Sequence, residues 1–153
     1  MNETGSNKSP FSKLVQIGIV VKDMDATIKS LTSLGIGPFE HRSVPAGAKE
    51  WYQGKPMNAT FKIAAANVGG VELEFIQPVD GESPHRAFLD EKGEGIQHLA
   101  FAVEKLDKNI EDLTRKGASV QMQSDLGILK VAYMDLETSG LVFELMQFME
   151  TIK

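Results

Sequence analysis

The sequence predicts an α+β fold made of two paired βαβββ modules. Two matches between the halves of the chain lead to this prediction: a strand followed by a helix and, later in each half, a strand that carries a glutamate. A third observation is that the helix of each half ends at a glycine, the residue that most easily adopts the left-handed conformation at a helix end.

The first match joins segment 15–21 to segment 96–103. With Gln16 laid on His98, the alignment continues without a gap through the helix that follows. The coincident pairs are Asp25 with Asp107, Ile28 with Ile110, Leu31 with Leu113, Thr32 with Thr114 and Gly35 with Gly117.

The second match lays segment 71–77 over segment 141–147 and places Glu74 on Glu144. Chance likeness between two βα units would explain part of the first match and would less easily explain the second. We therefore interpret the chain as a duplication.

The first module is expected over residues 11–79. Its opening strand is β-branched and apolar, as a buried strand should be. Asp23 or Asp25 can cap the next helix, and Gly35 ends it. The other elements expected here are strands at 39–44, 58–66 and 70–77, a loop over 45–56 and a hairpin turn over 67–70.

A connector over 80–94 with a short helix at 84–91 leads to the second module, expected over 95–153. The second module repeats the scheme with a strand at 95–103, a helix at 106–116 and strands near 118–123, 128–135 and 140–147. Residues 1–10 are polar, without the apolar stretch of a signal peptide, and are expected to form a disordered tail.

The composition excludes several functions. A net charge of −5, with lysine and arginine scattered among the acids, leaves no basic stripe for a nucleic acid. The absence of cysteine excludes disulfides, a thiolate nucleophile and a cysteine zinc site. No apolar run approaches the roughly 18 residues of a membrane-spanning helix, so neither membrane nor nucleic acid is expected as a partner, and a cytoplasmic location is the default.

Four polar side chains each stand among apolar neighbours in a predicted strand: Gln16, Glu74, His98 and Glu144. An ionised carboxylate is costly to bury without a partner, and one divalent cation would satisfy all four groups together. Taken singly, each residue could instead be the solvated outward position of a half-exposed strand. The joint pattern favours the metal site.

Other polar and aromatic candidates are weaker. His41 and His85 lie in polar surroundings and are expected at the solvated surface. The pair at 51–52, Trp and Tyr, either lines a pocket mouth or covers the neighbouring loop.

At these residues the sequence resembles the vicinal-oxygen-chelate superfamily, which includes glyoxalase I, methylmalonyl-CoA epimerase, extradiol dioxygenases and bleomycin- or fosfomycin-resistance proteins. The resemblance covers 13–147 and implies a cup-shaped mixed sheet around one divalent ion (Zn, Co, Ni or Mn) held by Gln16, Glu74, His98 and Glu144. The supporting motifs are QIGIVV at 16–21, EFIQP at 74–78, ESP at 82–84, FL at 88–89, KGEGIQHLAF at 92–101 and VFEL at 142–145.

The branch of the family is divided between two resemblances. The segment 82–95 looks most like methylmalonyl-CoA epimerase, whereas a Gln, Glu, His, Glu ligand set looks like eukaryotic glyoxalase I. Epimerases usually have histidine where Gln16 stands and a catalytic glutamate in the strand that corresponds to 60–64, where this chain has none. The glycine-rich loop before their penultimate strand is reduced to 125–127.

Both resemblances imply proton abstraction beside a carbonyl, with the enolate oxygen held on the cation. The expected activity is an isomerase or epimerase acting on an acyl thioester such as methylmalonyl-CoA, with Glu144 moving the proton. The alternatives are lactoylglutathione lyase acting on a glutathione hemithioacetal, and a metal-free protein that binds a small molecule, as the resistance proteins do. Exposed edge strands favour a homodimer.

Overall fold

The structure is a computed structural model that describes residues 9–150. Most of the tail expected over 1–10, and the last three residues of the second module, lie outside these described residues. The helices are α1 (Met24–Ser33), α2 (Pro84–Lys92) and α3 (Leu106–Arg115). The strands are β1 (Leu14–Val20), β2 (Glu40–Arg42), β3 (Lys49–Tyr52), β4 (Lys55–Pro56), β5 (Thr60–Val68), β6 (Val71–Asp80), β7 (Gly95–Ala102), β8 (Ser119–Asp125), β9 (Leu129–Asp135) and β10 (Val142–Phe148).

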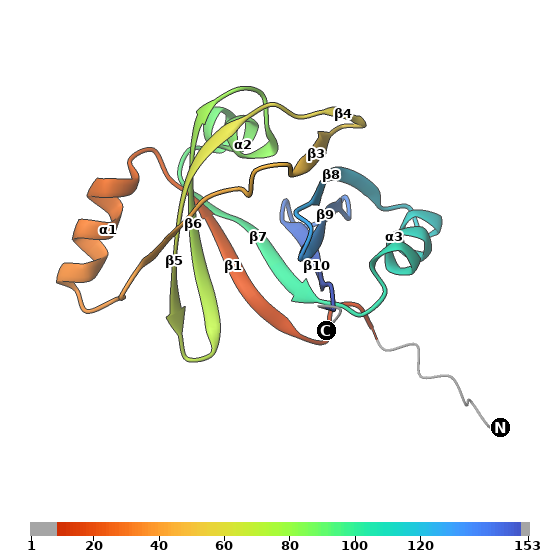
Figure 1. Ribbon diagram of the computed structural model, residues 1–153, viewed down its shortest axis with the longest axis horizontal. Coiled ribbons are helices and arrows are strands. Elements are labelled where there is room, and N and C mark those ends of the chain that lie inside the picture. The colour runs from red at the N-terminus through yellow and green to blue at the C-terminus, as the bar shows by residue number, and fades with distance from the viewer. Residues whose placement is uncertain (1–8, 151–153) are drawn as a thin grey trace.

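All the strands join one mixed sheet in the order β2-β5-β6-β1-β7-β10-β9-β8-β3-β4. The two halves mirror one another about the antiparallel pair β1 and β7, each of which pairs in parallel with the last long strand of its own half. Figure 1 shows the sheet curled, with α1 and α3 outside its two ends and α2 across one rim. This confirms the predicted α+β fold of two paired modules around a cup.

The helices α1 and α2 begin at residues whose side chains cap them, whereas α3 starts after Lys105 without a side-chain cap. The Asp23 side chain accepts a hydrogen bond from the Ala26 amide at 3.0 Å, so Asp23 caps α1. Ser83 caps α2 in the same way, with Pro84 in the first turn. Gly35, with φ +93°, follows α1 as predicted.

Apolar side chains fill both faces of the sheet. Met24 of α1 packs with Phe75 on the outer face of the first half. Leu106 of α3 packs with Leu145 on the outer face of the second half. The concave face of the second half is lined by a separate cluster made of Ala100, Met122, Val131, Tyr133, Val142 and Met146. The helices α1 and α3 therefore cover the outer face of the curled sheet, and the concave face remains available for the site.

The loop predicted over 45–56 is wrong, because this segment contains β3 and β4. β3 leaves the first half and pairs antiparallel with β8 of the second half, with Glu50 opposite Ser124. A strand of four residues has too little alternation to reveal itself, and its hydrogen-bonding partner lies far along the chain. The segment adds a second connection between the halves and brings Glu50 to the cup.

The outer edges of the sheet are the short strands β2 and β4, which offer little length for pairing with another chain. Homodimer formation therefore stays a prediction. No helix within residues 9–150 is long and apolar enough to cross a membrane.

Candidate functional site

His98 lies at the centre of the sheet, on β7. Gly18 of β1 pairs with His98, and the next residue, Ile19, pairs with Ile96, so Gln97 is an extra residue in the ladder. This bulge lets Gln97 and His98 both face inward, with 2% and 0% of their surfaces exposed. The His98 ring lies directly over Gly18, where a Cβ atom would come within 1.9 Å of Cε1. Gly18 is thus required for space.

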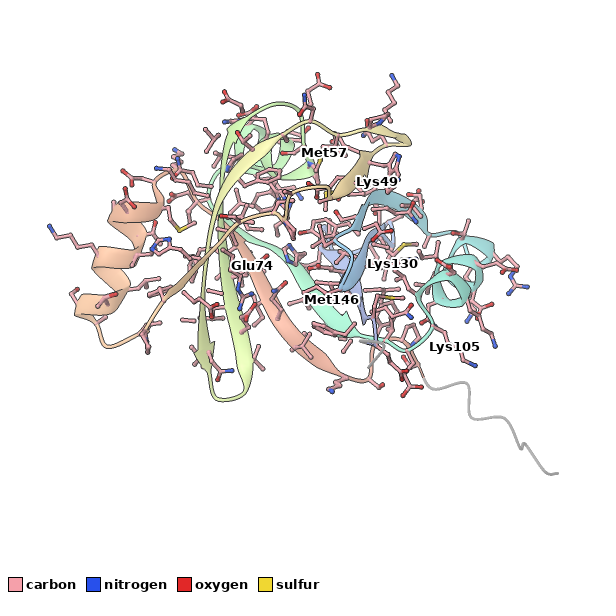
Figure 2. The ribbon with its side chains drawn as sticks, in the orientation of Figure 1. Lys49, Met57, Glu74, Lys105, Lys130 and Met146 are labelled. Atoms are coloured by element: carbon pink, nitrogen blue, oxygen red, sulfur yellow. The ribbon has the colours of Figure 1, made fainter. Side chains whose placement is uncertain are left out.

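The structure brings all four predicted polar residues together around Nε2 of His98. The distances from this nitrogen are 3.0 Å to Glu144 Oε2, 3.3 Å to Gln16 Oε1 and 3.9 Å to Glu74 Oε1. The four residues come from β1, β6, β7 and β10, which are neighbours in the sheet. Figure 2 shows Glu74 and Met146 on the two halves of the curled sheet that meet at this point.

Burial and crowding of charge shift the ionisation of this cluster. Burial raises the pKa of Glu74 to about 7, and the neighbouring charge of Glu144 adds to the effect. For His98, burial disfavours the charged ring, but the carboxylates of Glu144 and Glu74 outweigh it and raise the pKa. The site therefore attracts positive charge.

A second glutamate, Glu72, orients the Gln16 amide. Gln16 Nε2 donates hydrogen bonds to Glu72 Oε1 at 2.8 Å and to Glu74 Oε2 at 3.1 Å, which turns Gln16 Oε1 toward His98. Arg42 of β2 holds Glu72 with two hydrogen bonds of 2.5 Å. Burial opposes ionisation of Glu72, yet the hydrogen bonds from Arg42 and Gln16 prevail and lower its pKa. Sequence reasoning missed Glu72, although its position two residues before Glu74 places it on the same strand face.

The other side of His98 contacts residues that sequence reasoning also missed. Gln97 Oε1 lies 3.0 Å from His98 Nδ1 and 2.8 Å from Nδ1 of His85. The prediction that His85 is solvated is wrong, because only 4% of its surface is exposed. Its helix, α2, is short and has polar neighbours, but this residue faces the sheet, between the rings of Phe61 and Tyr133. His41 is exposed, as predicted.

The donor atoms fit a divalent cation. A cation about 2.1 Å from each donor would separate neighbouring donors by about 3.0 Å at octahedral angles and about 3.4 Å at tetrahedral angles. The separations from His98 Nε2 to Glu144 Oε2 and Gln16 Oε1 are of this size, and the separation of 3.9 Å to Glu74 Oε1 is longer. Glu144 Oε2 is buried without a hydrogen bond of acceptable geometry, which leaves it available as a ligand. Within residues 9–150 no group of three or more histidine, cysteine, aspartate or glutamate side chains is arranged to hold a metal ion by itself. Gln16 Oε1 is a further donor beside the histidine and the two glutamates.

Glu50 adds another carboxylate to the concave face. Its Oε2 accepts a hydrogen bond of 2.7 Å from Ser124, which is buried. Burial raises the pKa of Tyr133 well above its ordinary value, and the charges of Glu144, Glu74 and Glu50 add to the effect. Tyr133 therefore remains a neutral hydroxyl near three carboxylates. Because the segment that holds Glu50 was predicted to be a loop, no sequence pattern indicated that Glu50 would face the site.

Two cavities lie beside the cluster rather than at it, since neither is lined by Gln16, Glu74, His98 or Glu144. One, of about 360 Å³, lies between α2 and the turn before β10, and its lining includes Gln97, Gln121 and Val142. The other, of about 350 Å³, is lined by Trp51, Gly54 and β8. Of the two alternatives for the aromatic pair at 51–52, the lining of a pocket is thus observed for Trp51.

Comparison with known proteins places the chain in a family. Residues 15–132 match the model of the Glyoxalase/Bleomycin resistance protein/Dioxygenase superfamily. A curated relative, the uncharacterized protein YqjC of Bacillus subtilis, is 30% identical over 95 residues, which cover 54% of this chain and 62% of that protein. The match therefore spans less than two thirds of the relative's length.

Solved structures share the fold at low identity. The hypothetical protein BH1468 of Bacillus halodurans has a TM-score of 0.67 and 23% identity, covering 92% of this chain and 97% of its own. Methylmalonyl-CoA epimerase of Mycobacterium tuberculosis has a TM-score of 0.69 and 21% identity, covering 94% and 92%. A Streptomyces coelicolor methylmalonyl-CoA epimerase variant in complex with 2-nitronate-propionyl-CoA has a TM-score of 0.64 and 21% identity, covering 90% and 98%. With the family model matching most of the chain, the protein belongs to the Glyoxalase/Bleomycin resistance protein/Dioxygenase superfamily.

Proposed function

We propose that the chain is a divalent-metal-dependent isomerase or epimerase that moves a proton on the carbon beside a carbonyl group. The observation that carries this proposal is the convergence of Gln16, Glu74 and Glu144 on Nε2 of the buried His98. Two carboxylates, an amide oxygen and an imidazole make a donor set for one divalent cation. When bound there, the cation would supply positive charge that stabilises negative charge developing on a carbonyl oxygen.

The proposed substrate class is an acyl thioester such as methylmalonyl-CoA. Solved epimerases of this name share the fold, and one of them is in complex with 2-nitronate-propionyl-CoA. The cavity of about 360 Å³ has a size that suits an acyl group, and Gln97 belongs both to its lining and to the surroundings of His98. The polar amides of Gln97 and Gln121 would meet a thioester carbonyl or carboxylate there.

Two carboxylates are candidates for moving the proton. Glu144 is the predicted one, and its Oε2 is buried without a satisfactory hydrogen bond. Glu50 is the second, since Ser124 donates the one hydrogen bond found to its carboxylate within residues 9–150 and it faces the same interior. Epimerisation removes the proton from one face of the α-carbon and returns one to the opposite face, and two carboxylates in one cup are able to divide these tasks.

The decisive experiment measures metal content and proton exchange on the same preparation. Protein purified without chelator should carry about one divalent ion per chain, as for a site with one set of donors. It should exchange the α-proton of methylmalonyl-CoA for deuterium in D2O, as followed by proton NMR. The proposal fails if the protein binds no stoichiometric Zn, Co, Ni or Mn and exchanges no proton.

Variants separate ligands from proton carriers. His98→Ala should lose the metal. Glu144→Gln should abolish exchange while weakening metal binding less than His98→Ala does. Glu50→Gln should keep the metal, and a loss of exchange in it would assign a proton transfer to Glu50. The matched control is Glu111→Gln, which removes an exposed carboxylate on the outer helix α3 and should alter neither measurement.

Lactoylglutathione lyase is the second candidate, favoured by the observation that the Gln, Glu, His, Glu set does converge. Incubation with methylglyoxal and glutathione distinguishes the two candidate activities, because only the lyase should form a thioester product, which is followed by its ultraviolet absorbance. If purified protein contains no metal, the result would favour the third alternative, a protein that binds a small molecule without a metal ion. Homodimer formation belongs to the same proposal and is tested by light scattering.

A further inference from the structure

The two halves of the sheet differ in the residue that lies alongside the polar side chain of the first strand. In the first half, β1 and β6 pair in parallel with Gln16 alongside Glu72. In the second half, β7 and β10 pair in parallel with His98 alongside Val142. These positions are equivalent in the repeat, because Glu72 and Val142 each lie two residues before the glutamate that their strand contributes to the cluster. A carboxylate therefore accompanies the amide, and an apolar side chain accompanies the imidazole.

An amide needs a neighbouring group to fix which of its two ends faces a given point. The oxygen and the NH2 group of a glutamine have nearly the same shape, but the oxygen accepts hydrogen bonds and binds cations, whereas the NH2 group donates hydrogen bonds and binds none. Half a turn about the last side-chain torsion exchanges the two ends. An acceptor placed beside the NH2 group therefore selects the orientation in which the oxygen faces the other way.

Glu72 is such an acceptor. Gln16 Nε2 donates one hydrogen bond to Glu72 Oε1 at 2.8 Å and another to Glu74 Oε2 at 3.1 Å, so both amide hydrogens are used. Gln16 Oε1 then lies 3.3 Å from His98 Nε2. Only 3% of the Gln16 surface is exposed, so bulk water is poorly placed to replace a lost acceptor.

Arg42 fixes the Glu72 carboxylate from the edge strand β2. Its two terminal nitrogens donate to the two carboxylate oxygens at 2.5 Å, and Glu72 Oε1 accepts from Arg42 and Gln16 at the same time. The side chains of Arg42 and Glu72 are 37% and 25% exposed, and an ion pair with this exposure contributes little to the stability of a fold. The arrangement therefore matters more for the amide that it holds than for the sheet edge.

We propose that Glu72, held by Arg42, is a positioning residue that selects the orientation of the Gln16 amide in which Oε1 faces the cluster. The orientation itself follows from hydrogen bonds within the chain, whereas its use for holding a cation rests on the proposed function. Loss of a group that orients a metal ligand typically weakens metal affinity about 10-fold to 100-fold.

The test compares two substitutions of Glu72. Glu72→Met removes the acceptor at nearly constant side-chain length, whereas Glu72→Gln keeps one oxygen, which is able to accept from both Gln16 and Arg42. Each is also made together with Gln16→Glu, which presents an oxygen in either orientation and so has no need of Glu72. The control is Glu40→Met, which removes an exposed carboxylate from the same face of β2 as Arg42. Thermal unfolding checks that every variant folds.

Two readouts are taken. The first is the orientation of the Gln16 amide in metal-free protein, from nuclear Overhauser effects of its NH2 protons. In wild type these protons should lie close to the side-chain protons of Glu72, and after half a turn they would approach Hε1 of His98. Gln16→Glu lacks these signals and so identifies them. The second readout is the dissociation constant of Zn²⁺ from calorimetry.

Glu72→Met should bring the Gln16 NH2 protons to the His98 ring and weaken Zn²⁺ binding about 10-fold to 100-fold. Glu72→Gln should keep the orientation and weaken binding by a much smaller factor, and Glu40→Met should alter neither readout. In the Gln16→Glu background the difference between the two substitutions should disappear. Arg42→Met should also weaken Zn²⁺ binding, although the removal of a positive charge would by itself strengthen it.

Several outcomes would overturn this inference. Gln16 NH2 protons close to His98 in wild type would do so even if Zn²⁺ binds tightly. Equal loss of Zn²⁺ affinity in Glu72→Met and Glu72→Gln would assign Glu72 an effect of charge alone, and stronger binding in Arg42→Met would remove Arg42 from the arrangement. Absence of Zn²⁺ binding in wild type overturns the proposed metal site instead, and the orientation of the amide then decides the inference.

Discussion

Replacement of Gly18 by alanine should disrupt the site by contact with a single side chain. Gly18 pairs with both Glu74 and His98 across the two neighbouring strands, so it lies at the centre of the four-residue cluster. A Cβ added to it would lie 1.9 Å from Cε1, 2.2 Å from Nε2 and 2.3 Å from Nδ1 of the His98 ring.

The size of the effect follows from these distances. Carbon atoms in contact stand about 3.5 to 4.0 Å apart, so the His98 ring must move by about 1.5 to 2 Å. The ring is fully buried, bonded to Gln97 at 3.0 Å and packed against Tyr133 with centroids 4.9 Å apart, so it has little space to move into. Overpacking of this kind costs about 1 to 3 kcal/mol, and we expect Gly18→Ala to lie in the upper half of that range.

The matched control is Gly18→Ala in a His98→Ala background. Without the imidazole the clash disappears, and alanine in a strand is favoured over glycine by about 0.5 to 1 kcal/mol through the unfolded state. The substitution should therefore be neutral or stabilising there. The difference between the two effects predicts a coupling energy of about 2 to 4 kcal/mol between positions 18 and 98.

The assay is urea unfolding of the four proteins of this double-mutant cycle in the presence of chelator, with the slope of the transition checked for constancy. Zn²⁺ affinity of Gly18→Ala should fall as well, because the ring displacement moves Nε2 away from Glu144 and Gln16. A cost below about 0.5 kcal/mol for Gly18→Ala, or the same cost in both backgrounds, would refute the reasoning.

Three further predictions concern pH and backbone. The pKa of His85 is about 3 in the folded chain and 6.5 in a free residue, so between these pH values the side chain takes up a proton when the protein unfolds. The free energy of unfolding should therefore fall as the pH falls, by up to about 1.4 kcal/mol per pH unit. Urea midpoints at pH 6.5 and 4.5 should show this dependence in wild type and less of it in His85→Phe. Because the pKa of Glu72 is lowered, its pairing with Arg42 stabilises the protein above pH 4.5, and this contribution is lost as pH falls through the lowered pKa. Arg42→Met should cost at most about 1 kcal/mol at pH 7, given the partial exposure of both side chains, and the cost should shrink as the pH is lowered; a cost that does not depend on pH would contradict the ionic origin. Gly81→Ala should lower the melting temperature more than Gly47→Ala, since both glycines have φ +83° but only the Gly81 Cβ would meet a backbone oxygen, at 2.4 Å; equal effects would contradict the steric part of the argument.

The alignment of the two halves of the sequence predicted correctly which four polar side chains lie close together. Aligning the halves matched Gln16 with His98 and Glu74 with Glu144, and the four side chains do converge. The alignment succeeds because related modules place related residues at equivalent points, and the pairing of β1 with β7 brings those points together. Their binding of a metal stays a prediction that depends on the experiments above.

Local sequence patterns did not predict three residues near the site: His85, Gln97 and Glu50. His85 belongs to a short polar helix, and only its packing against the sheet reveals that it is buried. Gln97 faces inward because the ladder between β1 and β7 contains a bulge, and strand alternation holds only where pairing is regular.

By itself, the sequence determined the duplicated α+β architecture and the residues carried at the centre of its four inner strands, because strand periodicity and internal repetition are local properties of the chain. The tertiary structure decided which atoms touch. It brought Glu50 across to β8, turned Gln97 toward both histidines, and placed the His98 ring over Gly18. These contacts depend on the register and curvature of strands far apart in the chain, which no local pattern records.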